Sequence, residues 1–253
     1  MKTIFKFFML ISLIFTFAFA KDNSLTQIKD KGEFVVGLDD TFAPMGFRNN
    51  KGEIVGFDID LAKEVSRRMG VKAVFVPCDW DGILFNLRSK KIDAIWNGLT
   101  ITETRAKQIA FSDPYFNDDQ IILVKRKNIK TLDDLKNKNI GLQMGSSAYF
   151  ALENSPLAKE VKDIKKYPSN VEALLDLEAG RTDAVVMDSV VAKYYISKKP
   201  EFRILGQPLK KEKIAIGLRK NDIALRNEIN STLTEIKNDG TFNKIYVKWF
   251  GNK

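Results

Sequence analysis

The stretch IDAIWNGLTITETR, residues 92–105, takes the chain from an apolar run into a polar loop and then into the first turn of a helix. The apolar run at 92–96 predicts a buried strand, and Thr102 followed three residues later by Arg105 is typical of a helix N-terminus. Backbone amides, threonine hydroxyls and the planar guanidinium of Arg105 would meet where the strand ends, an arrangement that binds a carboxylate. On these residues alone, the alternative is that Thr102 is a plain helix cap and Arg105 a surface ion-pair partner.

Strand and helix signals alternate on both sides of this stretch. The first series has strands at 34–38, 71–76 and 92–96 and helices at 57–69 and 82–90. A second series follows residues 112–117, with strands at 120–124, 139–142, 163–167 and 183–187 and helices starting at 131, 146, 169 and 189. A strand at 213–218 and helices at 222–238 and 241–250 close the chain. The alternation predicts an α/β protein with parallel, doubly wound sheets, and the composition shift at 114–119 favours two domains.

The N-terminal residues predict an export signal. Lys2 and Lys6 precede an apolar run at 7–17, and Ala18-Phe19-Ala20 supplies small residues where a signal peptidase cleaves. The run is too short for a membrane anchor, which needs roughly 20 residues. The only cysteine, Cys78, lies far from the cleavage point, so a lipid anchor is not expected. We therefore expect cleavage after Ala20 and a soluble protein, most simply in a bacterial periplasm.

The composition excludes several classes of function. The chain has no histidine, which removes Ser-His-Asp and Cys-His catalysis and histidine-based zinc sites. It has no phosphate-loop or dinucleotide glycine pattern, and neither a cofactor nor a metal is expected. The net charge of +9 includes lysine runs that are interleaved with acids and not with aromatic residues, so nucleic-acid binding is not expected. The residues argue for binding more than for catalysis.

Seven short motifs, spread over the chain, carry a family resemblance. They are VVGLDDTFAP at 35–44, GFDIDL at 56–61, WDGIL at 80–84, the stretch ending at Arg105, FSDPY at 111–115, GSS at 145–147 and DGTF at 239–242. In this order they resemble the periplasmic amino-acid-binding proteins of ABC transporters, that is, bacterial extracellular solute-binding protein family 3. The resemblance is strongest to the lysine/arginine/ornithine, histidine and glutamine binders, and it covers essentially the whole chain after the export signal.

The resemblance implies the type II periplasmic-binding-protein fold, in which two α/β lobes with doubly wound sheets are joined by a two-strand hinge. On this chain the hinge strands should cross near residues 117–120 and 207–213. We therefore expect a signal peptide at 1–20, lobe 1 at 21–118, lobe 2 at 119–210 and a return to lobe 1 at 211–253. Such a protein is a monomer that closes its lobes on one amino acid and delivers it to an ABC permease in the inner membrane.

For the backbone of an amino-acid ligand, the resemblance implies two groups of residues. Arg105, with the backbone amides of Thr100 and Ser147, would hold the α-carboxylate. Asp188, with the carbonyl of Gly98 and the hydroxyl of Thr100, would accept the α-ammonium. The alternative for Asp188 is that it only caps the helix that follows it.

For the ligand side chain, the resemblance implies a distal subsite. Phe42 and Trp80 match its aromatic walls, and Asp39 matches the acid that reaches a distal cation; the alternatives are core packing for both rings and a turn for Asp39. Because Arg105 and Asp188 would neutralise the ligand backbone, Asp39 needs a cationic partner, and cation–π attraction adds about 0.5–2 kcal/mol. We therefore expect arginine, lysine, ornithine or histidine first, and glutamine next.

Three positions depart from the pattern of the basic-amino-acid binders. Gly98, preceded by Asn97, stands where those binders tend to have serine, and Gln143 with Met144 replaces an aliphatic residue and an amide. Asn97 and Gln143 are nevertheless expected at the ligand. The Trp80-Asp81-Gly82 form recurs in cystine binders, so cystine is a further alternative ligand.

Two functions of other classes stay open on the sequence. The same fold supports a periplasmic dehydratase of prephenate-like substrates, similar to cyclohexadienyl dehydratase, in which Asp39 or Glu103 would be the acid. Exported binding proteins of this type can also be displayed on the cell surface as adhesins.

Overall fold

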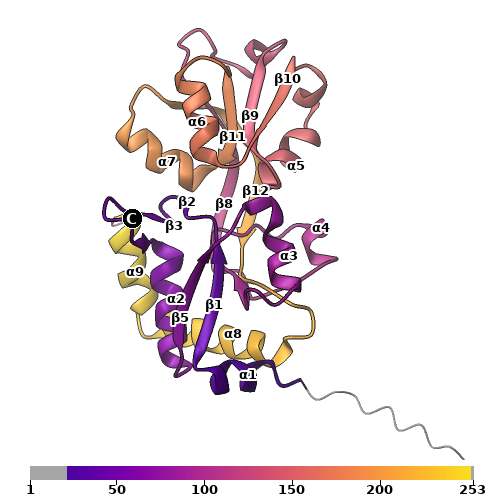
Figure 1. Ribbon diagram of the computed structural model, residues 1–253. Helices are drawn as coiled ribbons and strands as arrows, with labels where there is room; N and C mark the ends of the chain where they lie inside the picture. Colours follow the sequence, from indigo (N-terminus) through magenta and orange to yellow (C-terminus); the bar gives the residue numbers. More distant parts are fainter. Residues whose placement is uncertain (1–21, 252–253) are drawn as a thin grey trace, which may run out of the picture.

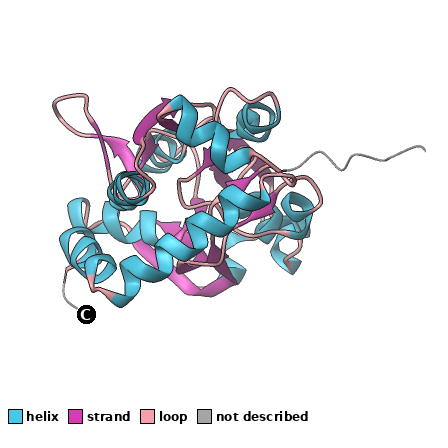
Figure 2. Cartoon of the chain, turned by 90° about the horizontal axis from the view of Figure 1, so that it is seen from below, coloured by secondary structure: helices cyan, strands magenta, loops and turns pink. Residues whose placement is uncertain are grey.

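The computed structural model describes residues 22–251, which form two lobes stacked end to end (Figure 1). Each lobe contains a five-stranded sheet, and a small three-stranded sheet is separate from both. Seen from below, helices lie on both sides of the strands (Figure 2). The two-lobed α/β architecture expected from the sequence is confirmed. The expected signal peptide at 1–20 and its cleavage after Ala20 lie outside the described residues.

The lower lobe of Figure 1 is built on a sheet with the strand order β5-β1-β6-β13-β7. Its strands are β1 (Glu33–Leu38), β5 (Lys72–Pro77), β6 (Ala94–Ile95), β7 (Ala110–Phe111) and β13 (Gly217–Leu218), and its helices are α1 (Ser24–Lys31), α2 (Phe57–Arg68), η1 (Trp80–Gly82), α3 (Ile83–Arg88), α4 (Glu103–Ala106), α8 (Ile223–Asn238) and α9 (Thr241–Phe250). Alternate residues of β1 face opposite cores. Phe34 and Val36 pack in the cluster that contains the apolar faces of α2 and α8, whereas Val35 packs with Ile83 and Leu87 of α3. This period of two is that of a strand covered on both faces.

The upper lobe has the strand order β10-β9-β11-β8-β12. Its strands are β8 (Phe116–Val124), β9 (Asn139–Gln143), β10 (Asp163–Tyr167), β11 (Ala184–Asp188) and β12 (Arg203–Ile214), and its helices are η2 (Leu132–Leu135), α5 (Ser147–Glu153), η3 (Pro156–Lys159), α6 (Asn170–Glu178) and α7 (Ser189–Lys198). Ile122 and Val124 of β8 pack with Leu152 of α5, while Ile121 and Leu123 belong to the cluster that includes α6. This sheet is therefore also covered on both faces.

The strands β8 and β12 run between the two lobes (Figure 1). They pair antiparallel from Phe116 opposite Ile214 to Gln120 opposite Lys210, and the register shifts between Lys210 and Leu205. The crossings expected near 117–120 and 207–213 fall on these paired strands. The exact lobe boundaries stay a prediction.

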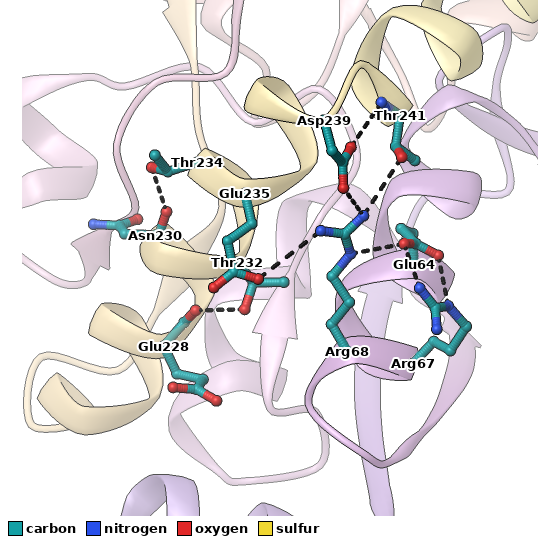
Figure 3. Close-up of polar contacts among 10 residues, drawn as sticks. All are labelled: Glu64, Arg67, Arg68, Glu228, Asn230, Thr232, Thr234, Glu235, Asp239 and Thr241. Atoms are coloured by element: carbon teal, nitrogen blue, oxygen red, sulfur yellow. Dashed lines mark hydrogen bonds and ion pairs between the residues drawn. The ribbon is translucent and has the colours of Figure 1, made fainter.

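A group of charged residues connects the C-terminal helices α8 and α9 to α2 (Figure 3). Arg68 donates through Nε to Glu64 Oε1 at 2.7 Å and through Nη2 to Asp239 Oδ2 at 2.5 Å, and Asp239 Oδ1 accepts from the amide of Thr241 at 2.9 Å. Hydrogen bonds from Arg67 and Arg68 lower the pKa of Glu64 to about 2, and those from Thr241 and Arg68 lower the pKa of Asp239 to about 2. The motif at 239–242 therefore joins distant segments of the lower lobe.

The structure differs from the sequence-based expectation in three places. Both large sheets are mixed and not purely parallel, because β8, β12 and β13 enter them antiparallel to their neighbours. The strand expected at 213–218 is divided: Ile214 pairs with the hinge strand β8 and Gly217 with β6, so the pairing partner changes as the chain returns to the lower lobe. The helix expected from residue 131 is only the 3₁₀ turn η2.

The small sheet was not expected from the sequence. It consists of β2 (Thr41–Phe42), β3 (Gly46–Arg48) and β4 (Ile54–Val55), which are too short to give a clear periodic pattern. Across residues 22–251, no helix combines the length and the apolar character that a membrane span requires.

Candidate functional site

The ten residues expected at the site are all buried, and both lobes contribute to them. In the lower lobe, Asp39 and Asn97 follow the carboxyl ends of the parallel strands β1 and β6. In the upper lobe, Gln143 and Asp188 end the parallel strands β9 and β11. Ligands of open α/β sheets bind at this end of the strands. Gln143 Nε2 donates to Asp39 Oδ2 at 2.7 Å, so the lobes are closed on one another here.

Arg105 lies at the meeting point of the lobes and not on the surface. The helix α4 begins as expected, since Thr102 Oγ1 accepts from the amide of Arg105 at 3.2 Å. The Arg105 residue is 6% exposed, which excludes the surface ion pair. Its Nη1 donates to the carbonyl of Thr100 at 2.9 Å and its Nη2 to the carbonyl of Gly145, in the upper lobe, at 3.2 Å. Burial lowers the pKa of Arg105 to about 10, so the guanidinium stays charged at neutral pH with N–H groups left for an anion.

Asp188 forms the centre of a second group. It stands at the N-cap position of α7 but makes no capping bond, so the cap alternative is wrong. Its Oδ1 accepts from Gln120 Nε2 at 2.9 Å. Burial, together with the charges of Asp118 and Glu212, raises the pKa of Asp188 well above its ordinary value. An ammonium group beside Asp188 would relieve this crowding of carboxylates.

The hydroxyls of Thr100 and Ser147 join this group across the lobes; the Thr100 hydroxyl was expected at the ligand, whereas for Ser147 only the backbone amide was. Ser147 Oγ donates to Thr100 Oγ1 at 3.1 Å, and Thr100 Oγ1 donates to Glu212 Oε2 at 2.8 Å. Gln120 Nε2 lies 3.1 Å from Ser147 Oγ and 3.0 Å from Glu212 Oε2. Thr100, Ser147 and Asp188 are thus connected through Gln120 and Glu212, which belong to the two hinge strands.

Gly98 has a physical reason to be glycine. Its φ is +60°, a conformation that residues with a Cβ rarely adopt, and a Cβ there would lie 2.6 Å from Phe42 Cε1. Its amide donates to Asp58 Oδ2 at 2.7 Å, and Asp58 Oδ1 accepts from the hydroxyl of Tyr115 at 2.8 Å. Burial raises the pKa of Asp58 to about 7. A serine at position 98 would therefore collide with Phe42, which explains why this chain departs from the serine of the basic-amino-acid binders.

Phe42 and Trp80 present parallel rings. Their planes differ by 4° and their centroids lie 6.4 Å apart. The guanidinium carbon of Arg105 lies 5.6 Å from the centroid of Trp80. The core alternative also holds in part, because Phe42 packs in one apolar cluster and Trp80 in another. A cation over such a ring face gains about 0.5–2 kcal/mol.

Asp39 belongs to a different hydrogen-bond group from Asp188. Its Oδ1 accepts from the amide and the hydroxyl of Thr41, at 2.9 and 2.6 Å, so the turn alternative also holds. Its amide donates to Asn97 Oδ1 at 3.2 Å, and Gln143, which donates to its Oδ2, accepts from Asn170 Nδ2 at 3.2 Å. Burial raises the pKa of Asp39, against the hydrogen bonds that it accepts. Gln143 therefore positions the Asp39 carboxylate, and Asn97 holds the backbone of Asp39.

Sequence reasoning missed Gln120 and Glu212. Glu212 follows Lys210-Lys211, one of the lysine runs of the sequence, and those lysines are exposed. The signal that could have found Glu212 is the strand period of two, which puts it on the same buried face as Ile214. Within the part of the chain that the structure describes, no group of three His, Cys, Asp or Glu side chains is arranged to hold a metal ion.

Comparisons with known proteins agree with this geometry. The family model for bacterial extracellular solute-binding proteins, family 3, matches residues 34–252. The chain is 39% identical over 225 residues to the lysine/arginine/ornithine-binding periplasmic protein of Escherichia coli, covering 85% of this chain and 86% of that protein. It is 32% identical over 238 residues to the L-cystine-binding protein TcyJ of Escherichia coli, covering 92% and 88%.

A solved structure shows the same fold. It is an ABC uptake transporter substrate-binding protein from Streptococcus pneumoniae with bound histidine. The TM-score is 0.88 at 35% identity, over 92% of this chain and 97% of that chain. The three proteins carry different ligands in their names, so the comparisons alone leave the ligand of this chain undecided.

Proposed function

The chain belongs to family 3 of the bacterial extracellular solute-binding proteins, and from that premise we propose that it binds a basic L-amino acid, arginine first, between its two lobes. It is the amino-acid-binding component of an ABC uptake system and not an enzyme. Delivery to a permease, a monomeric state and location in the periplasm are parts of the proposal; one of the relatives named above, the lysine/arginine/ornithine-binding protein, is periplasmic.

The charge balance of the site is the observation that carries the choice of ligand. Arg105 and Asp188 match the two charges of an amino-acid backbone, which leaves Asp39, 7% exposed, without a cationic partner. The hydrogen bonds to Asp39 occupy both acceptor positions of Oδ1 and one of Oδ2, so one acceptor position is left for a ligand. A cationic side chain supplies both the charge and the donor.

The ring geometry favours a planar cation within the basic class. Phe42 and Trp80 differ by 4° in orientation and their centroids lie 6.4 Å apart, so a flat group can stack on one of these ring faces but not between both without moving them. A guanidinium or an imidazolium is flat, whereas the ammonium of lysine or ornithine is tetrahedral. We therefore place arginine and histidine ahead of lysine and ornithine, with glutamine and cystine as the alternatives.

The dehydratase alternative gains no support from the position of its expected acids. Glu103 is exposed on α4, outside the buried site. Asp39 is bonded to Thr41 and Gln143, so its Oδ1 acceptor positions are already filled.

A thermal-shift screen tests the proposal. The protein is unfolded and refolded to remove any copurified ligand, then mixed with the twenty amino acids, ornithine, citrulline and cystine. Ligand binding to the folded state raises the melting temperature by mass action, and we expect the largest rise with arginine. A rise with glutamine or cystine alone would refute the argument from Asp39, and no rise with any compound would refute amino-acid binding. Arg105→Ala is the matched negative control.

A further inference from the structure

Glu212 is a buried carboxylate on the hinge strand β12. It is 6% exposed and lies between the exposed residues Lys211 and Lys213. Its Oε2 accepts from Thr100 Oγ1 at 2.8 Å and from Gln120 Nε2 at 3.0 Å, whereas its buried Oε1 has no hydrogen-bond partner. Leaving a buried acceptor without a donor costs free energy. The corner of the site formed by Thr100, Gln120, Ser147, Asp188 and Glu212 therefore suits an incoming hydrogen-bond donor.

The hydrogens in this corner are all committed to protein acceptors. The single hydroxyl hydrogen of Thr100 points to Glu212, and that of Ser147 points to Thr100. The two amide hydrogens of Gln120 face three acceptors, on Asp188, Ser147 and Glu212, at 2.9–3.1 Å. No hydroxyl or amide hydrogen of these three donors is therefore free to turn toward a ligand.

What remains in the corner is acceptor capacity. One lone pair is left on each hydroxyl oxygen of Thr100 and Ser147, and carboxylate oxygens are left on Asp188 and Glu212. A primary ammonium brings three donors and a positive charge, which match this set. A hydroxyl brings one donor and no charge, and a keto group brings no donor at all.

We propose that Glu212 is a positioning residue that makes the protein specific for α-amino acids over the corresponding α-hydroxy acids. It acts through Thr100: by accepting the hydroxyl hydrogen, the Glu212 carboxylate keeps the Thr100 oxygen lone pair turned toward the ligand. This inference rests on the proposed function, because it takes the corner around Asp188 as the place of the α-ammonium.

Glu212→Met is the decisive variant, since it removes both carboxylate oxygens at similar side-chain length, so the hydroxyl hydrogen of Thr100 loses its acceptor and can turn toward the ligand. L-arginine and its α-hydroxy analogue are titrated calorimetrically into both proteins. We expect the ratio of their affinities to fall at least about tenfold, mostly through weaker arginine binding. Lys211→Gln, exposed on the same strand, is the control that leaves the ratio unchanged.

A double-mutant cycle separates this role from a merely structural one. Thr100→Val removes the hydroxyl and should lower the same ratio, and Glu212→Met should then lower it no further. Where Glu212→Met does not fold, Glu212→Asp is the second variant: it keeps the carboxylate but shortens it away from Thr100 Oγ1, and it should lower the ratio in the same direction. An equal loss of affinity for both ligands, or an unchanged ratio, would overturn the inference. Absence of arginine binding by the unmodified protein would instead refute the proposed function.

Discussion

Asp39→Asn is expected to remove the preference for a cationic ligand side chain. Because Oδ1 of Asp39 accepts two hydrogen bonds from Thr41, the new amide nitrogen would replace Oδ2, which lies 2.7 Å from Gln143 Nε2. Two N–H donors would then face each other. Gln143 does not gain by turning over, since its Oε1 already accepts from Asn170 at 3.2 Å.

The lost ion pair sets the size of the effect. Removing one partner of a buried ion pair costs about 3–5 kcal/mol, which corresponds to at least about a 10²-fold loss in affinity for arginine. Citrulline has nearly the shape of arginine but no charge on its side chain. Citrulline loses only the hydrogen bond between Gln143 and residue 39, which arginine loses as well, so we expect its affinity to fall less than that of arginine, by about tenfold for a cost of about 1.4 kcal/mol.

Calorimetric titration of both proteins with arginine and with citrulline measures the effect as a ratio. Asp40→Asn is the matched control, because Asp40 is the next residue and pairs with the exposed Arg48 outside the site. It should leave both affinities within about twofold. If Asp39→Asn weakens arginine and citrulline by the same factor, the charge argument for Asp39 is refuted.

Three further predictions follow from the site. Arg105→Lys keeps the charge but loses the two-pronged donor, so affinity for any amino acid should fall about 10²-fold in calorimetry, and an unchanged affinity would contradict the role of the guanidinium. Gly98→Ala forces a Cβ into a positive-φ position 2.6 Å from Phe42, and should cost about 1–2 kcal/mol or more in denaturant unfolding; an unchanged midpoint would contradict it. The pKa of Asp188 is raised in the free protein and a bound ammonium lowers it, so binding should release protons and weaken as the pH falls below that raised pKa. Calorimetry in buffers of different ionisation enthalpy checks this, and binding without proton release would count against Asp188 as the ammonium partner.

Much of the fold could be predicted because long elements have clear periods. The strands around Val35, Ile140 and Val185 and the helices at 57–69 and 222–238 lie where the apolar pattern put them. Whether a strand is parallel or antiparallel to its neighbours could not be predicted. The apolar periodicity of a strand is the same in both cases, also where the strand enters its sheet from the other lobe. The partner change between Ile214 and Gly217 is a tertiary event of this kind.

The candidate site was likewise predicted only in part from the sequence. Arg105 could be found from the residues, because it opens a helix after an apolar strand, whereas Asp188 was expected from the family resemblance; the structure buries both. Glu212 was missed because its neighbours in the sequence are lysines, and its burial depends on the pairing of β12 with β8. Asn97 and Gln143 were expected at the ligand, and the structure adds that they bond to Asp39.

Titration of the refolded protein with L-arginine tests the central claim most directly. The account predicts that one arginine binds per chain with a submicromolar Kd, because the site is closed and its charges match those of the ligand. It also predicts that citrulline binds at least about 10²-fold more weakly. Absence of arginine binding, or citrulline and glutamine binding as tightly as arginine, would contradict the claim that the site selects a basic amino acid.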